Sequence, residues 1–117
     1  KLSRRGVVHC FTGTLDEARA YHALGFFTSL TGIITFPDRK NPVRRSPIQE
    51  MVARLPLEWT MVETDAPYLT PHPHRKERNE PWMVKFVAQK IAELQSISVE
   101  EVERITDENA ERLFGIR

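Results

Sequence analysis

Cysteine is nearly absent from this sequence of 117 residues, which contains a single one, Cys10. One thiol cannot form an intramolecular disulfide, so a disulfide-stapled secreted domain is excluded and a reducing compartment is expected. No apolar run approaches the roughly 20 residues of a membrane span, and the stretch Lys1–Arg5 lacks the core of a signal peptide. We therefore expect a cytoplasmic protein that has no membrane partner.

An excess of charge of one sign is also missing, because the formal net charge is +1. This balance is not typical of a protein that holds DNA tightly through a basic surface. The charges are unevenly spread, however, with arginine and lysine concentrated in residues 38–45 and acidic residues in 98–111. Two solvated faces are the simpler interpretation, and guidance of a polyanion by the basic stretch is the alternative.

Hydrophobic residues make up 40% and charged residues 28%, as in an ordinary soluble globular domain. We expect residues 1–117 to belong to one domain. Apolar and β-branched stretches predict strands over residues 6–11, 26–36 and 59–64. Helices are expected between them, after the capping-box residues Thr14 and Ser46.

The alternation of strands and helices predicts an α/β fold with parallel strands. A Pro- and His-rich loop over residues 66–78 follows the third strand. A longer helix opening at 79–81 and two short helices, starting at Ser98 and Thr106, then close the sequence. Three parallel strands need cover on both faces and do not form a stable open sheet alone. The chain is therefore expected to associate with something or to lack part of a larger protein.

Polar ionisable residues occur where two of these strands end. His9 ends the first strand, and Glu63 and Asp65 end the third. Ligands and catalytic groups collect at this edge of a parallel sheet, and a histidine with an aspartate suits zinc, manganese or magnesium. Taken singly, each residue also has a structural interpretation: His9 as a hydrogen-bonded strand end, and Asp65 before Ala-Pro as a turn residue.

Five motifs in order resemble the TatD family of metal-dependent deoxyribonucleases, relatives of the amidohydrolases. They are His-Cys-Phe-Thr-Gly at 9–13, Ser-Leu-Thr-Gly-Ile-Ile-Thr-Phe at 29–36, Glu-Thr-Asp-Ala-Pro-Tyr-Leu at 63–69, the stretch 73–81, and Asn-Ala-Glu-Arg-Leu-Phe-Gly at 109–115. The match covers nearly the whole chain from Gly6 onward.

The resemblance implies a TIM (β/α)8 barrel that binds one or two divalent metal ions (Mg, Mn or Zn) and hydrolyses phosphodiester bonds in DNA. It assigns His9 and Asp65 as metal ligands, and Glu63 as a residue that orients the site. Asp65 is also the candidate catalytic group, placed to take a proton from the attacking water. The residues expected to contact substrate phosphate or to brace the loop are His74, Arg75, Arg78 and Asn79.

Several family features have no counterpart in these residues. The family's His-x-His on its first strand, its Glu on the fourth and its His on the fifth are absent. The chain is therefore expected to be the C-terminal part of the barrel, strands six to eight, and to be inactive by itself. Lys76 stands where the family usually has glycine. Cys10 is expected to be a small buried hydrophobe, His22 a surface or packing residue, and His72 solvent-facing.

Two other functions stay open. The chain can be a non-catalytic half-barrel that self-associates or binds a partner, such as a missing N-terminal half, through its unpaired strand edges. It can also be an amidohydrolase relative that cleaves C–N bonds, although the loop at 73–81 favours the nuclease branch.

Overall fold

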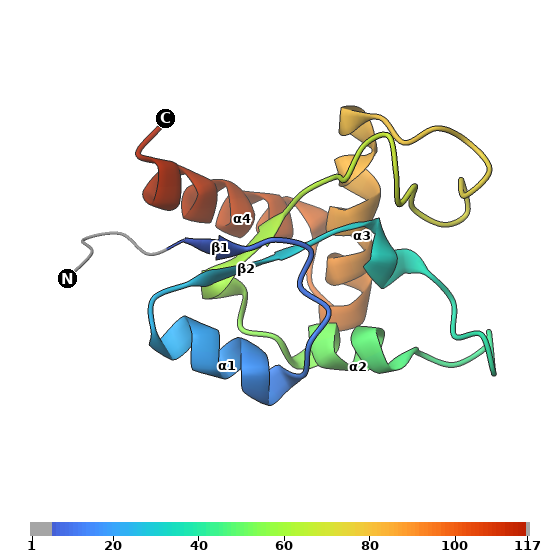
Figure 1. Ribbon diagram of the computed structural model, residues 1–117, viewed down its shortest axis with the longest axis horizontal. Coiled ribbons are helices and arrows are strands. Elements are labelled where there is room, and N and C mark those ends of the chain that lie inside the picture. The colour runs from blue at the N-terminus through green and yellow to red at the C-terminus, as the bar shows by residue number, and fades with distance from the viewer. Residues whose placement is uncertain (1–5, 117) are drawn as a thin grey trace.

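The computed structural model describes residues 6–116, which form a three-stranded parallel sheet covered by helices (Figure 1). In chain order the elements are β1 (Val7–Val8), α1 (Leu15–Ala23), β2 (Phe27–Leu30), the 3-10 helix η1 (Gly32–Thr35), α2 (Pro47–Arg54), the 3-10 helix η2 (Leu57–Trp59), β3 (Thr60–Val62), the 3-10 helix η3 (Pro81–Met83), α3 (Val84–Gln95) and α4 (Val99–Phe114). The predicted α/β class and parallel strands are confirmed.

The sheet has the order β1-β2-β3, so strands that are consecutive in the chain are also neighbours. The register pairs Val8 with Thr28, and Leu30 with Val62. Backbone bonds extend the pairing past the strands, since Phe11 N–H donates to the Ser29 carbonyl (2.8 Å) and Glu63 N–H to the Leu30 carbonyl (3.0 Å). The carboxyl ends of all three strands therefore meet at one edge.

The helices pack their apolar stripes against the sheet and one another. In the view of Figure 1, α1 and α2 lie below the sheet and α4 lies above it. Both predicted capping boxes are present, with Thr14 and Ser46 each accepting the N–H three residues ahead. The core they enclose includes Leu30, Val52 and Ile91, all fully buried. Among the helices of residues 6–116, none combines the length and apolar character needed to cross a bilayer.

The second strand is shorter than its sequence predicts. Its β-branched and aromatic residues indicated a strand to Phe36, but β2 ends at Leu30. The Thr31 side chain accepts the N–H of Ile33 and starts the 3-10 helix η1, while the Thr35 hydroxyl donates to the Gly32 carbonyl (2.6 Å). Local side-chain bonds to the backbone thus replace the strand ladder.

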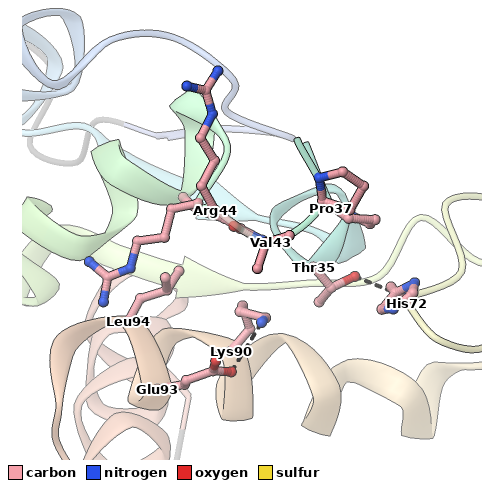
Figure 2. A pocket seen from close by; sticks show the side chains of 11 residues that line it. Thr35, Pro37, Val43, Arg44, His72, Lys90, Glu93 and Leu94 are labelled. Atoms are coloured by element: carbon pink, nitrogen blue, oxygen red, sulfur yellow. Dashed lines mark hydrogen bonds and ion pairs between the residues drawn. The ribbon is translucent and has the colours of Figure 1, made fainter. Parts of the chain in front are cut away.

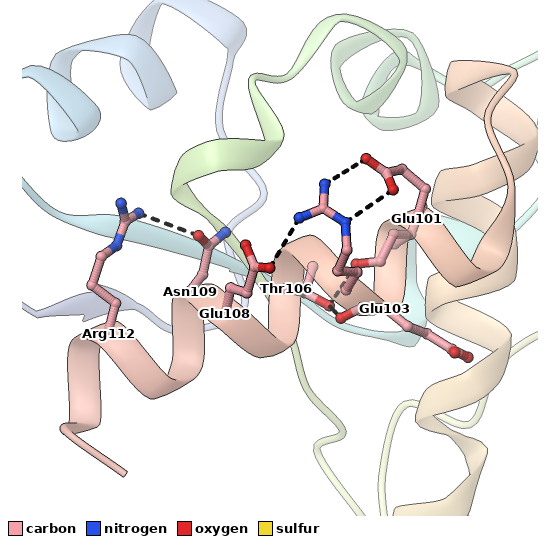
Figure 3. Close-up of polar contacts among 8 residues, drawn as sticks. Glu101, Glu103, Thr106, Glu108, Asn109 and Arg112 are labelled. Atoms are coloured by element: carbon pink, nitrogen blue, oxygen red, sulfur yellow. Dashed lines mark hydrogen bonds and ion pairs between the residues drawn. The ribbon is translucent and has the colours of Figure 1, made fainter. Parts of the chain in front are cut away.

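The two predicted closing helices are one continuous helix, α4. Thr106 does not start a second helix, because its buried hydroxyl donates back to the Val102 carbonyl (2.9 Å). Arg104 pairs with Glu101 and Glu108 along the exposed side of α4 (Figure 3), so these charges lie on a solvated face. On the other side, the Asn109 amide donates to the carbonyls of Leu57 and Thr60, and ties α4 to the start of β3.

His22 is a buried packing residue on α1. Its Nε2 lies 3.1 Å from the Thr28 hydroxyl, and its ring stacks on Trp59. Its Nδ1 is buried and has no hydrogen-bond partner among residues 6–116. Burial lowers the pKa of His22, and the charge of Glu58 offsets this only in part.

This burial predicts that the folded chain loses stability in acid. The folded pKa of His22 is below the ordinary 6.5, so its contribution is complete above that pH and declines as the pH falls toward the folded pKa. We expect His22→Gln to reduce the decline between pH 7 and 5, measured by urea unfolding at each pH. His72→Gln, which removes an exposed histidine, is the control. Equal pH dependence in wild type and His22→Gln contradicts this account.

Candidate metal site

A sharp turn at the end of β1 places His9 at the edge of the sheet. Cys10 adopts a left-handed backbone conformation (φ 49°), which turns the chain immediately after His9. The Cys10 sulfur lies 3.5 Å from the Thr31 hydroxyl and is only partly buried, so the expected full burial is not observed. His9 itself has an exposed side chain (63%). The turn thus presents an imidazole to solvent above the carboxyl ends of the strands.

His9, Glu63 and Asp65 come together at this edge. Nδ1 of His9 contacts Oε1 of Glu63, and Nε2 lies 3.9 Å from Oδ1 of Asp65. Glu63 is the most enclosed of the three, since its side chain is 19% exposed against 43% for Asp65. The imidazole is therefore held from one side by a carboxylate, and its other nitrogen is directed toward a second carboxylate.

The chemistry of these groups fits a divalent metal ion. Such an ion lies about 2.0–2.2 Å from imidazole nitrogen and carboxylate oxygen. Two ligand atoms that are 3.9 Å apart can both reach it. A histidine ligand commonly donates its other ring N–H to a carboxylate, which fixes the tautomer and the ring orientation. Glu63 is in the position for this supporting role, and His9 and Asp65 are in the position of ligands.

The ligand set is small. Across residues 6–116, no group of three or more histidine, cysteine, aspartate or glutamate side chains is arranged to hold a metal ion. His9 and Asp65 supply one nitrogen and carboxylate oxygen, whereas catalytic metal sites usually take three or more protein ligands. From the described residues, this edge therefore offers two candidate ligand groups, those of His9 and Asp65.

The loop that carries Asp65 is held by backbone and amide hydrogen bonds. Tyr68 N–H donates to the Asp65 carbonyl (2.7 Å), which closes a turn. Asn79 is buried at the far end of the loop, where its N–H donates to the Pro67 carbonyl and its side-chain amide to the Tyr68 carbonyl (2.7 Å). Asn79 therefore makes bracing contacts in this structure, and its contact with substrate phosphate stays a prediction.

The other loop residues predicted to support the site lie in different environments. Arg75 Nη1 donates to the Thr70 carbonyl (2.9 Å), and its guanidinium lies 4.1 Å from the centre of the Phe36 ring. His74 Nδ1 is 2.5 Å from Glu77 Oε2. Arg78 and Lys76 are exposed. Arg75 and His74 thus brace the loop in this structure, and contact of any of them with substrate stays a prediction.

Gly32, at the start of η1, lies against the backbone of the loop that follows Asp65. A Cβ added there would collide with the carbonyl oxygen of Leu69 and lie 3.2 Å from the nitrogen of Pro71. Only a residue without a side chain allows the η1 backbone to approach the loop of Asp65 so closely. The motif that contains Gly32 was recognised in the sequence, but this contact was not predicted from it.

Comparison with known proteins gives one family. The family model described as TatD related DNase matches residues 1–115. An uncharacterized metal-dependent hydrolase of Bacillus subtilis, YabD, is 46% identical over 111 residues, which are 95% of this chain and 41% of that protein. The 3'-5' ssDNA/RNA exonuclease TatD of Pantoea ananatis is 36% identical over 114 residues, which are 94% of this chain and 42% of that protein.

Solved structures agree with this result. A TatD homologue of Escherichia coli, YJJV, superposes with a TM-score of 0.82 at 29% identity, over 96% of this chain and 41% of that chain. A TatD family hydrolase of Entamoeba histolytica has a TM-score of 0.76 at 21% identity, over 92% of this chain and 41% of that chain, which shows a shared fold. The chain spans about two fifths of the length of the relatives that it matches.

Proposed function

Because this chain belongs to the TatD related DNase family, we propose that it forms part of the active site of a metal-dependent hydrolase that cleaves phosphodiester bonds in DNA. The observation that carries the proposal is the geometry at His9. Its Nε2 faces Asp65 at 3.9 Å, and its Nδ1 contacts Glu63. The relatives are named metal-dependent hydrolases, and some are named single-strand exonucleases.

In this proposal the sheet is the last three strands of a (β/α)8 barrel. Parallel neighbours in chain order and the coverage of about two fifths of longer relatives support it. In such barrels the catalytic groups lie at the carboxyl ends of the strands. His9 and Asp65 occupy that edge, and further ligands would come from outside residues 6–116, in the remainder of a barrel or in a second copy of the chain.

The residues of this chain have distinct tasks. Glu63, whose Oε1 contacts Nδ1 of His9, would accept the N–H of that nitrogen and so direct the lone pair of Nε2 into the site. Asp65 supplies an anionic oxygen beside it, and a carboxylate there can also accept a proton from the attacking water. A bound divalent ion (Mg, Mn or Zn) would supply Lewis acidity, which activates water and neutralises phosphate charge. Arg75 and Arg78 remain candidates for contacts with substrate phosphate.

The proposal predicts metal-dependent DNA hydrolysis that needs His9 and Asp65. A suitable protein is a chimera in which this chain replaces the matching two fifths of the Bacillus subtilis relative. We expect the chimera to degrade labelled single-stranded DNA in the presence of Mn²⁺ or Mg²⁺. The degradation should stop when EDTA is added. We expect His9→Ala or Asp65→Ala to reduce the rate by at least about 100-fold, because each removes a metal ligand.

Two controls sharpen this test. Asp16→Ala removes an exposed carboxylate on α1 and should leave the rate unchanged. A series of small amides assayed in parallel tests for hydrolysis of C–N bonds instead. If the chimera is folded and active but indifferent to His9→Ala and Asp65→Ala, the assignment of the ligands is wrong. If it cleaves amides and not DNA, the proposed reaction is wrong.

A further inference from the structure

A polar surface pocket of about 260 Å³ lies between the loop that follows η1, the loop of Asp65 and helix α3 (Figure 2). Arg44 and Arg45 come from the first loop, His72 from the second, and Lys90 from α3. Both loops leave the carboxyl ends of neighbouring strands, which is the edge that also holds His9 and Asp65. One of the two loops, the loop of Asp65, also carries a candidate metal ligand.

Hydrogen bonds between the elements keep the pocket walls in place. The Thr35 hydroxyl accepts the backbone N–H of His72 (2.8 Å), which joins the two loops directly, as Figure 2 shows. Gln49, buried at the start of α2, donates its amide to the Ile34 carbonyl (2.9 Å) and to the Phe36 carbonyl (3.4 Å). The pocket is thus built into the fold and does not depend on exposed side chains alone.

Three cationic side chains, those of Arg44, Arg45 and Lys90, and one carboxylate, that of Glu93, line the pocket. Lys90 is paired with Glu93 at 3.0 Å. Arg44 uses Nε to bind Asp38 (3.1 Å), which is compatible with its terminal nitrogens binding another anion. Arg45 has no ion-pair partner in the part of the chain that the structure describes. Guanidinium groups bind phosphate oxygens in pairs, so this lining suits a phosphate group.

We propose that this pocket binds a backbone phosphate of the nucleic-acid strand next to the phosphodiester that is cleaved. The inference rests on the proposed function, because β2 and β3 are the last two strands of a barrel only if the chain is part of the proposed (β/α)8 barrel. In (β/α)8 enzymes the loops after those two strands frequently form a phosphate-binding site. A strand that enters at His9 and Asp65 would then be held at a second point by Arg44 and Arg45.

Binding of a fluorescein-labelled single-stranded oligodeoxynucleotide to this chain tests the proposal. Anisotropy is measured in EDTA over a series of salt concentrations, so that neither metal nor hydrolysis contributes. We expect the double variant Arg44→Gln/Arg45→Gln to bind about 5- to 10-fold more weakly, and its salt dependence to be shallower by roughly 0.7 per lost contact. Arg45→Gln alone, which leaves the bond between Arg44 and Asp38 intact, should show about half of this change in slope.

Arg19→Gln is the matched control, because it removes one exposed positive charge from α1, away from the pocket. Retained binding in this variant supports a local site. Equal weakening in Arg19→Gln, or absence of oligonucleotide binding by the wild type, overturns the proposal. Inorganic phosphate is added as a competitor, at a concentration equal to that of the phosphate groups of the oligonucleotide. If it displaces the oligonucleotide, the pocket is a site for free phosphate, and the proposal is overturned.

Mn²⁺ binding by the chimera that carries Arg44→Gln/Arg45→Gln, where the remaining barrel is present, separates this inference from the proposed function. We expect the metal affinity of the double variant to equal that of the wild type. If metal binds but the arginine substitutions do not weaken oligonucleotide binding, only the proposed phosphate pocket is wrong, and the proposed function stands. If the arginine substitutions weaken oligonucleotide binding but the protein binds no metal at His9, the proposed function is wrong. The pocket would then bind phosphate, but not beside a cleavage site, so this inference would be wrong as well.

Discussion

Replacing Glu63 by glutamine is expected to weaken divalent-metal binding by about 10- to 100-fold, although Glu63 is not proposed as a ligand. The carboxylate contacts Nδ1 of His9 and, in the proposed site, would keep the proton on that nitrogen and the lone pair on Nε2. Glutamine is nearly the same size but carries no charge and can turn its amide N–H toward the ring. The His9 ring would then lose its fixed tautomer and orientation. Isothermal titration of the chimera with Mn²⁺ or Zn²⁺ measures the change.

Glu77→Gln provides a matched control for this substitution. Glu77 also pairs with a histidine Nδ1, that of His74 at 2.5 Å, and it lies in the same loop outside the candidate site. We expect its replacement to leave the metal affinity unchanged. If Glu63→Gln lowers the unfolding temperature but not the metal affinity, then Glu63 and His9 form a structural pair, and the interpretation of His9 as a strand-end residue is correct.

The second large effect is expected from Gly32→Ala, which should destabilise the chain by about 1–3 kcal/mol. The new Cβ would collide with the Leu69 carbonyl and crowd Pro71, and these are largely backbone atoms that cannot rotate away. The loop that carries Asp65 has to move to relieve the overlap. We therefore expect metal affinity to fall together with stability, measured by urea unfolding and by metal titration of the same sample.

Gly6→Ala is the control for the general effect of adding a methyl group to a glycine. Among residues 6–116, a Cβ at Gly6 would meet the Phe26 ring, at 3.4 Å, which is ordinary contact. We expect its stability to change by no more than about 0.5 kcal/mol. Equal effects of the two substitutions would show that the close approach of Gly32 to the Asp65 loop is not important for either property.

The sequence was sufficient to predict that His9, Glu63 and Asp65 share one edge, because parallel strands place their carboxyl ends together. It was also sufficient for the starts of α1 and α2, where Thr14 and Ser46 satisfy the first backbone donors through a local pattern. These features depend on residues that are close in the sequence or on the general geometry of parallel sheets. They need no knowledge of how the loops pack.

Contacts between distant residues were not predictable in the same way. The contact of Glu63 with Nδ1 of His9 depends on the register of three strands and on the turn at Cys10. The end of β2 at Leu30 depends on hydroxyl bonds that compete with the strand ladder. Similarly, the basic residues 38–45 were visible as a cluster, but the sequence does not place Lys90 and His72 beside them.

His9 and Asp65 are proposed to hold the metal ion together with ligands from the rest of the barrel. Mn²⁺ titration of the isotope-labelled chimera, followed by NMR, tests this assignment. Paramagnetic Mn²⁺ broadens the signals of nuclei close to it. We expect broadening to begin at His9 and Asp65 and to disappear in Asp65→Ala. Broadening that begins on the acidic face of α4, around Glu101 and Glu108, and leaves the signals of His9 sharp would contradict it.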